Sequence, residues 1–546
     1  MHCNRVATAV VSALGLACGW ATTTEAAIDD VSLVSVTASG AQAAGDSNLR
    51  HGGGALSADG RYVVFHSYRE SLVRNDRNGV ADVFLRDLDR GVTRLVSAAW
   101  DGGSADSYSV DASISADGRH VAFYSPATNL VAGDANGSGD IVVWSRESGT
   151  LEIASVNSNE RAGNDESLES AISADGRFVA FTSFASNLAR NDTNGRSDVF
   201  LRDRQAGYTE RVSVASDGSQ AKGYSWQPSV SADGRFVAFY STASNLVPDD
   251  RGGMADVFVR DRQTRETRRV SEAADGTPAN GYSVQPVVSA NGRYVAFVSA
   301  ARNLVAGDSN GLIDVFVKDL ASGAVERVSV ATGGAQAKGP SFEPAISADG
   351  RYVAFESFAS NLVAGDTNGH NDVFVHDRET HTTRRVSEAP NGTPANDDNW
   401  TPSISEDGRF VAFRSDATNL AASDGNQSSD VYVTDLGPRE TGGTSFTLRP
   451  AALDFGSHAV GTSTTQSFWL HNRASTYLAI DGMEIRGTGS TAFEVKHACG
   501  ALVAPDGGCG IHVTFPPTAA GPATAELRVR AEGGVVRTRE LIGDAP

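Results

Sequence analysis

Apolar and polar residues alternate over short stretches along most of the chain, and Gly, Asn, Asp and Ser separate these stretches. Two examples are Arg235–Ser241, RFVAFYS, and Ala255–Arg262, ADVFVRDR. Short apolar alternation bounded by turn residues predicts β-strands of five to eight residues. No stretch shows the 3.6-residue period of a long amphipathic helix. We therefore predict an all-β chain.

One phrase, SADGRFVAF with small variations, recurs along the chain. Each copy begins 58 residues after the one before it, with no slip in register. A fixed period of this size indicates a repeat architecture, in which each repeat is one structural unit. The seven copies begin at Ser57, Ser115, Ser173, Ser231, Ser289, Ser347 and Ser405.

Each repeat contains four strand-like segments, and an Asp-Gly pair joins the first two as in a type I′ hairpin turn. Four antiparallel strands repeated seven times predict a seven-bladed β-propeller. The last repeat has only three such segments and ends at Leu436. The missing fourth strand resembles Val31–Val36, VSLVSV, which precedes the first repeat. We expect this segment to complete the last blade and close the ring, which removes two exposed strand edges.

The repeat resembles a known family. Ile346–Phe355, ISADGRYVAF, followed by Asp372–Asp377, DVFVHD, is similar to the WD-like repeat of TolB and tricorn-type propellers. The resemblance covers residues 28–438 and implies the propeller fold. It implies little about activity, because this fold hosts many functions.

The composition changes after Gly437–Gly443, GPRETGG. Residues 444–546 show alternating apolar positions and turn signals that predict a small antiparallel sandwich, preceded by a linker at 439–443. Segments such as LDFG at Leu453–Gly456 and VTFPPTAAG at Val513–Gly521 resemble the Hydin/ASPM/SPD-2-like immunoglobulin-type family, known in bacteria as choice-of-anchor D. That resemblance implies a role in adhesion or spacing and no catalytic residues.

An Asp-rich loop lies between the second and third strands of every repeat, as in Asn361–Val375, NLVAGDTNGHNDVFV. Its acids match part of an EF-hand calcium loop, although position 12 is apolar. Asn-Gly turns and Asp side chains that cap backbone N–H groups explain the same pattern without a metal. Both interpretations, a calcium cofactor or a repeated turn, stay open. The candidate ligands are Asp76, Asp82, Asp134, Asp140, Asp192, Asp198, Asp250, Asp256, Asp308, Asp314, Asp366, Asp372, Asp424 and Asp430.

A second polar column lies four residues before each repeat serine, on the innermost strand and close to the central channel. Acids, amides and aromatic residues around a channel mouth can receive a sugar or a peptide. The alternative is that these side chains line the channel with water. The candidate binding residues at this mouth are Asp111, Glu169, Gln227, Gln285, Glu343, Thr401, Trp226 and Trp400.

Catalytic motifs are weak in this chain. No nucleophile, base and orienting residue emerge together, so an enzyme is the less favoured hypothesis. HGGG at His51–Gly54 looks like an oxyanion-hole motif, yet no α/β-hydrolase pattern surrounds it. The enzyme alternative is a carbohydrate-active lyase or glycosidase that uses carboxylates at the channel, with Glu169 and Glu343 as first candidates.

The charge and the N-terminus indicate where the protein works. The net charge of −20 disfavours binding to nucleic acid or to an anionic membrane. Residues 1–27 are typical of a secretory signal peptide, with lipid attachment at Cys18 as a weaker alternative. In an exported protein, Cys499 and Cys509 are expected to form a disulfide. The Arg202–Arg204 segment, RDR, is predicted as a solvated edge with local ion pairs.

These observations predict an exported protein that is periplasmic, extracellular or associated with the cell surface. We expect a monomer without a transmembrane segment, in which a seven-bladed β-propeller (28–438) precedes an immunoglobulin-like β-sandwich (444–546). The expected function is binding or scaffolding through an acidic, polar propeller face that recognises a protein or glycan ligand, with calcium as a candidate stabiliser.

Overall fold

The structure is a computed structural model that describes most of the chain. Residues 1–29, with the predicted signal peptide, and the linker at 439–443 lie outside the described residues. Among the described residues, no helix has the length and apolar character needed to cross a membrane. The described residues are 30–37, 39–42, 45–50, 52–69, 72–74, 76–250, 253–389, 392–421, 424–437, 446–449, 452–472, 478–487, 489–500, 502–503, 508–531 and 535–545.

Residues 30–435 form four-stranded antiparallel sheets, one for each sequence repeat, which we call sheets 1 to 7. Sheet 1 contains β2 (Ser47–Asn48), β3 (Tyr62–Ser67), β4 (Asp82–Asp87) and β5 (Val92–Leu95). Sheet 2 contains β6 (Val110–Ile114), β7 (His120–Ser125), β8 (Asp140–Ser145) and β9 (Leu151–Ile153). Sheet 3 contains β10 (Ser167–Ile172), β11 (Phe178–Ser183), β12 (Asp198–Asp203) and β13 (Tyr208–Arg211).

The remaining sheets repeat this order along the chain. Sheet 4 contains β14 (Ser225–Val230), β15 (Phe236–Ser241), β16 (Asp256–Asp261) and β17 (Glu266–Arg269). Sheet 5 contains β18 (Ser283–Val288), β19 (Tyr294–Ser299), β20 (Asp314–Asp319) and β21 (Val325–Arg327). Sheet 6 contains β22 (Ser341–Ile346), β23 (Tyr352–Ser357), β24 (Asp372–Asp377) and β25 (Thr382–Arg385). Sheet 7 contains β26 (Asn399–Ile404), β27 (Phe410–Ser415), β28 (Asp430–Asp435) and β1 (Asp30–Leu33).

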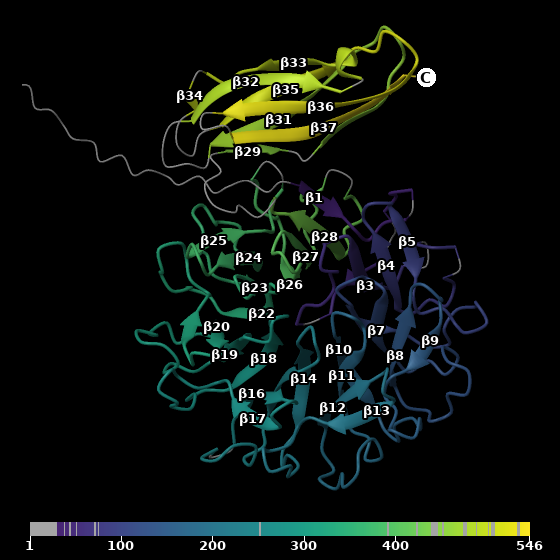
Figure 1. The fold of residues 1–546 in the computed structure, drawn as a ribbon, viewed down its shortest axis with the longest axis vertical. Helices are drawn as coiled ribbons and strands as arrows, with labels where there is room; N and C mark the ends of the chain where they lie inside the picture. The colour runs from purple at the N-terminus through teal and green to yellow at the C-terminus, as the bar shows by residue number, and fades with distance from the viewer. Residues whose placement is uncertain are drawn as a thin grey trace, which may run out of the picture.

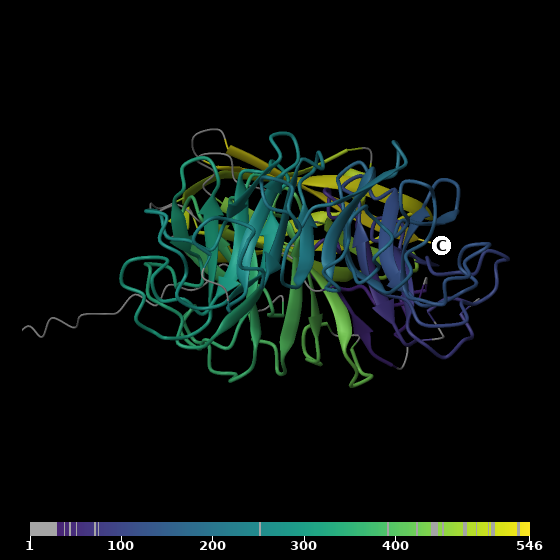
Figure 2. The same cartoon turned by 90° about the horizontal axis from the view of Figure 1, so that it is seen from below.

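The sheets stand around a common axis, as Figure 1 shows from one face and Figure 2 from the side. A closed circle of backbone hydrogen bonds joins each sheet to the next at the turn after its first strand. The chain therefore has a β-propeller fold. The circle comprises Ala58 N–H to Ala116 O, Ala116 to Ala174, Ala174 to Ala232, Ala232 to Ala290, Asn291 to Ala348, Ala348 to Glu406 and Glu406 to Ala58, at 2.9–3.2 Å.

The predicted ring closure is confirmed. Strand β1 pairs antiparallel with β28, with Asp30 opposite Asp435 and Leu33 opposite Tyr432. The first and last segments of the propeller thus share sheet 7, so that strand pairing rather than a loop closes the ring. This pairing covers the outer edge of β28, which would otherwise present unpaired backbone groups.

The prediction of a type I′ turn at the Asp-Gly pairs is wrong. Gly118 has a φ of 65°, whereas the preceding Asp117 has no positive φ, and a type I′ turn needs a positive φ at both central residues. The loop contains a tight turn with Gly118 at its end, closed by the Gly118 N–H to Ser115 O bond of 2.9 Å. Gly118 is also required by packing, because a Cβ there would lie 2.4 Å from the Tyr62 ring of the preceding sheet.

The prediction that Arg202–Arg204 forms a solvent-exposed edge is wrong, because its first two residues are buried. Arg202 is 5% exposed and Asp203 is 7% exposed. Asp203 accepts two hydrogen bonds from Arg177, at 2.9 and 2.7 Å, across the pair of strands β11 and β12. Arg204 pairs with Glu152 of sheet 2 at 2.5 Å. The segment therefore links strands and sheets instead of facing solvent.

The C-terminal part, residues 446–545, contains two sheets, of strand order β29-β31-β35-β33 and β30-β37-β36-β32-β34. Phe455, Phe493 and Phe515 pack together with ring centroids 5.0–5.9 Å apart, in a core that draws on both sheets. The elements are β29 (Phe446–Arg449), β30 (Ala452–Ser457), β31 (Thr464–Asn472), β32 (Leu478–Arg486), η1 (Ser490–Ala492), β33 (Glu494–His497), β34 (Leu502–Val503), β35 (Gly508–Phe515), β36 (Gly521–Ala531) and β37 (Val535–Ala545).

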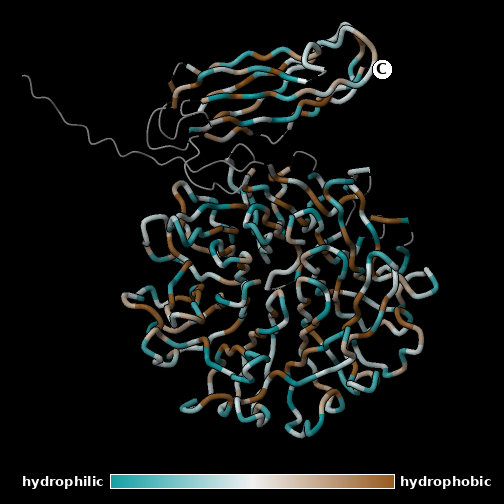
Figure 3. The backbone as a smooth tube through the Cα atoms, viewed as in Figure 1, coloured by the Kyte–Doolittle hydropathy of each residue, from teal (hydrophilic) through white to brown (hydrophobic). Residues whose placement is uncertain are grey.

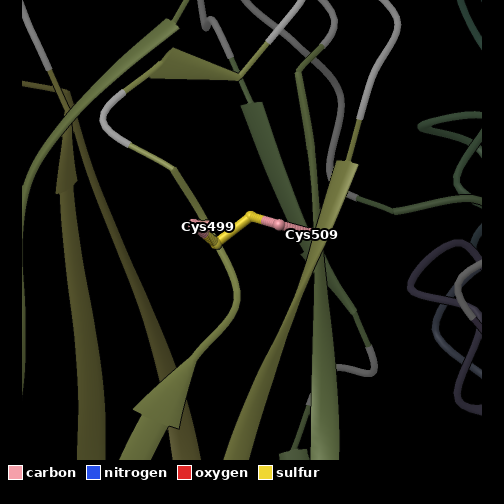
Figure 4. Close-up of a disulfide and its surroundings, with 2 residues drawn as sticks. All are labelled: Cys499 and Cys509. Atoms are coloured by element: carbon pink, nitrogen blue, oxygen red, sulfur yellow. A yellow bond between two sulfur atoms is a disulfide. The ribbon is translucent and has the colours of Figure 1, made fainter.

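The predicted disulfide between Cys499 and Cys509 is present, and it ties the segment after β33 to strand β35 (Figure 4). Both half-cystines are buried within the core of this part. Along the whole chain, hydrophobic and hydrophilic residues intermix within the strands, as Figure 3 shows. That pattern is the one from which the strands were predicted.

Arg69 stabilises the closure of the ring from a buried position. Its side chain is fully buried, and Nη1 lies 2.8 Å from Asp430 Oδ1 at the start of β28. The same guanidinium donates to Ser35 O at 3.0 Å, just after β1, and to Ser429 O at 3.2 Å. One side chain from sheet 1 therefore holds both ends of the propeller sequence in sheet 7.

We predict that Arg69→Ala lowers the free energy of unfolding by roughly 3–5 kcal/mol, because it leaves the Asp430 carboxylate buried without its cation. Urea unfolding at pH 7 measures the change. The matched control is Arg161→Ala, which removes an exposed arginine and should change the value by less than about 0.5 kcal/mol. An equal effect of both substitutions would contradict the role of Arg69.

Candidate functional site

The second aspartate of each Asp-rich loop lies at the start of the third strand, and it is buried in every sheet except sheet 4, where Asp256 is partly buried. Asp82, for example, is 1% exposed, and its Oδ1 accepts a hydrogen bond from Ser97 Oγ. The same serine oxygen accepts the Val83 backbone N–H at 3.0 Å. The equivalent serine to aspartate bonds measure 2.5–2.6 Å in sheets 1 to 6, and Ser35 supplies the bond to Asp430 in sheet 7.

The loop asparagine holds the other oxygen of this aspartate in several sheets. Asn136 Nδ2 donates to Asp140 Oδ2 at 2.7 Å and to Gly163 O at 3.1 Å. Asn194, Asn310 and Asn368 make the equivalent pair of bonds in sheets 3, 5 and 6. These contacts support the turn interpretation of the loops.

Burial dominates the protonation of the second aspartates. It raises the pKa of Asp140, Asp198 and Asp372 to about 6, although the serine and asparagine donors lower it. The pKa values of the equivalent aspartates in the other four sheets also rise, with burial as the largest cause. Each loop therefore holds a carboxylate whose charge is costly unless a donor or cation balances it.

The channel-mouth column has an unpredicted backbone conformation. Asp111, Glu169, Gln227, Gln285, Glu343 and Thr401 all have φ between 50° and 55°, and Gly53 has φ 74° in sheet 1. In sheets 2 to 7 the register of the first two strands shifts at this residue, which marks a β-bulge. A left-handed conformation at a non-glycine residue costs of order 1 kcal/mol.

Several side chains of this column hold neighbouring sheets together. Glu169 Oε2 accepts the backbone N–H of Gln227, from the next sheet, at 2.8 Å, and also the Thr182 hydroxyl at 3.0 Å. Gln285 exchanges hydrogen bonds with Glu343, whose own N–H donates to Gln285 Oε1 at 3.1 Å. The bulges thus place polar side chains where they satisfy backbone groups of the adjacent sheet.

Arg50 crosses the channel below this column, and the sequence analysis missed it. It is 8% exposed, and it donates to Gly53 O in sheet 1 and to Pro228 O in sheet 4, at 3.3 and 3.5 Å. Burial lowers the pKa of this guanidinium, and the charges of Asp111, Glu169 and Glu343 oppose the shift. The three glycines of HGGG follow Arg50 and His51, at the place where the other repeats have their first strand. This run of glycines was the signal that could have indicated an inserted side chain.

The channel is consequently divided into two parts. On one side of Arg50, a pocket of about 70 Å³ is lined by Asp111, Glu169, Gln227 and Gln285, together with Pro228 and Pro286. On the other side, a space of about 150 Å³ is lined mainly by small and branched apolar residues, such as Ile114 and Val230. The polar pocket is small enough to admit a single group of a larger ligand.

The remaining predicted mouth residues do not line this pocket. Glu343 and Thr401 are buried, at 7% and 3% exposure. Trp226 packs edge-on against Phe184 of sheet 3, with ring centroids 5.3 Å apart, and Arg414 lies 4.5 Å above the Trp400 ring. The four pocket residues are therefore brought together, whereas the two tryptophans surround them at the sheet junctions.

No protein-family model matches the chain, and no curated protein matches it. Similar solved structures include a putative TolB from Agrobacterium tumefaciens, at 16% identity and a TM-score of 0.34, covering 63% of this chain and 93% of that one. The WD40 repeats of RRP9 match at 10% identity and a TM-score of 0.38, covering 75% and 99%.

A third similar structure is the ASH/PapD-like domain of human CEP192, at 16% identity and a TM-score of 0.16, covering 20% of this chain and 89% of that one. TM-scores this low support no inference about function. The propeller fold rests on the strand order and on the circle of hydrogen bonds described above.

We predict that Arg50→Met destabilises the protein in a pH-dependent way. At pH 7 the loss should be about 3 kcal/mol, because Glu169 and its neighbours keep their charges without a nearby cation. Burial already raises the pKa of Glu169, and removal of Arg50 raises it further. A folded-state pKa above the unfolded value makes stability fall as pH rises, so the loss should be smaller at pH 4.5 than at pH 7.

Urea unfolding of both proteins at the two pH values measures this difference. Arg161→Met is the control, because it removes an exposed arginine from the surface. A loss that is equal or larger at pH 4.5 would show that Arg50 acts through packing alone.

Proposed function

We propose that this chain is an exported binding protein in which a closed seven-bladed propeller presents a ligand-recognition face, and in which an immunoglobulin-like sandwich spaces or attaches that propeller. The seven four-stranded sheets, and the pairing of β1 with β28 that closes their ring, support the first part of this proposal. The two packed sheets with a buried disulfide support the second. The signal-like N-terminus and the disulfide together favour export.

The observation that carries the binding proposal is the polar pocket above Arg50. Two carboxylates and two amides converge there from four sheets, while a ring of hydrogen bonds holds the supporting backbone rigid. Rigid, convergent polar groups on a scaffold are typical of recognition sites. The pocket is far below the size of a whole small-molecule site, so it suits one projecting group of a protein or a glycan.

The charge in and around the pocket favours hydrogen-bond donors and cations as that group. Asp111, Glu169 and Glu343 outnumber the single Arg50 guanidinium. Glu169 and Glu343 already accept hydrogen bonds from the backbone, at 2.8 Å from Gln227 and 3.0 Å from Gly52. Carboxylates committed to structural bonds are poorly suited to proton transfer, which favours recognition over the glycosidase or lyase alternative.

We predict that Asp111→Asn weakens binding at least about tenfold, since one charged hydrogen bond contributes about 1.5–3 kcal/mol. The measurement uses arrays of lysine-containing peptides and of oligosaccharides that contain amino sugars, probed with the chain from residue 28 onward. Asp217→Asn is the control, because it removes the same charge from an exposed loop. Equal binding by Asp111→Asn and the parent protein, on every probe bound, would overturn the proposal.

A further inference from the structure

The channel on the far side of Arg50 from the polar pocket is lined by two rings of side chains, and we call this space the apolar chamber. In the first ring each sheet contributes one Leu, Ile or Val, for example Ile114 in sheet 2 and Val230 in sheet 4. The second ring lies two residues further along each repeat and contains six alanines, for example Ala116 and Ala232. The wall of the chamber is therefore almost entirely apolar.

The size and rigidity of the apolar chamber make it a binding site for an apolar group. Its volume is about 150 Å³. An apolar cavity of about this volume in a protein holds a benzene molecule, which has six carbons. The closed circle of backbone hydrogen bonds passes through the second ring, as in the 2.9 Å bond from Ala58 N–H to Ala116 O. This circle keeps the wall from collapsing into the chamber.

Glu406 is the one charged residue of the second ring, because sheet 7 has this glutamate where the other six sheets have alanine. Its backbone N–H donates to Ala58 O at 3.2 Å, so the backbone keeps its place in the circle. Glu406 is half-buried, and among the described residues none donates a hydrogen bond to its carboxylate. Burial raises the pKa of this carboxyl, and the charge of Asp407 adds to the rise. A cation beside Glu406 would relieve this unfavourable environment.

The inner end of the apolar chamber has the opposite charge. Arg50 borders both the chamber and the polar pocket. Its guanidinium already faces the charges of Asp111, Glu169 and Glu343, so an anionic group of a ligand would meet these carboxylates as well. An ammonium group at the inner end would be repelled by Arg50. The two ends therefore favour a ligand whose apolar part points inward and whose cation stays beside Glu406.

We propose that the apolar chamber binds a compact apolar group attached to an ammonium, with the apolar group inside the two rings and the ammonium beside Glu406. The chemical class is an alkylammonium or arylalkylammonium ion. A free amine has this chemistry, and so has the amino terminus of a peptide that begins with Leu or Phe. The turn after the first strand and the Asp-rich loop lie at opposite ends of antiparallel strands, so this site opens on the other face of the propeller from those loops and is independent of the polar pocket.

Three probes of one shape test the proposal on the chain from residue 28 onward: benzylammonium, benzyl alcohol and benzoate. Titrations followed by NMR of the probe measure the three dissociation constants. Benzylammonium should bind at least about tenfold more tightly than benzyl alcohol, since a hydrogen bond to a charged group contributes about 1.5–3 kcal/mol, and benzoate should bind least. The peptide Phe-Gly-Gly identifies the source. Binding as tight as that of benzylammonium indicates a peptide terminus, whereas weaker binding indicates a free amine.

Glu406→Ala is the decisive variant, because it installs the residue that the other six sheets have and so keeps the fold. It should remove the preference for benzylammonium over benzyl alcohol. The control Glu494→Ala removes an exposed glutamate of β33 and should keep that preference. Ala232→Phe should weaken all three probes, because it places a ring inside the chamber. Its melting midpoint shows whether it folds like the parent protein.

Three results would overturn the proposal. The first is that benzylammonium does not bind to the parent protein. The second is that Glu406→Ala keeps the preference for benzylammonium. The third is an affinity for benzylammonium that falls in Asp111→Asn but not in Glu406→Ala, because this result would place the amine in the polar pocket instead.

Discussion

The structure depends on a carboxylate at the start of the third strand of every repeat, which is buried in all sheets but sheet 4, where it is partly buried. The serine two residues after the fourth strand donates to this carboxylate and accepts the next backbone N–H, so one pair of side chains joins the third and fourth strands. A buried charge of this kind is costly unless donors and a cation surround it. The repeat supplies the donors in every sheet, whereas the cation comes from different places, such as Arg327 in sheet 5 and Arg69 in sheet 7.

The same requirement explains how the ring closes. Sheet 7 is assembled from the two ends of the propeller sequence, and its buried aspartate is matched by Arg69 from sheet 1. In the equivalent position, the other repeats have alanine, as at Ala127 and Ala185. One substitution in the repeat thus both neutralises a buried acid and links the first sheet to the last. The closure of the ring and the neutralisation of the buried Asp430 therefore depend on the same arginine.

The 58-residue period predicted the sheets and the closing strand, and the two cysteines outside the signal segment predicted the disulfide. The period could not predict features that depend on neighbours in space. The left-handed bulge at Glu169 and its siblings is stabilised by bonds to the adjacent sheet. Arg50 lies outside the repeat pattern, and it enters the channel where glycines leave room. The Arg202–Arg204 segment looked exposed because its buried ion pairs join residues distant in sequence.

The central claim is that Arg69 joins the closure of the ring to the charge balance of the buried Asp430. A double-mutant cycle of urea unfolding with Arg69→Met and Asp430→Asn tests it most directly, because the cycle isolates the interaction between the two side chains. The account predicts that the double variant loses less unfolding free energy than the sum of the two single losses, by about 1–3 kcal/mol. Strictly additive losses would contradict it.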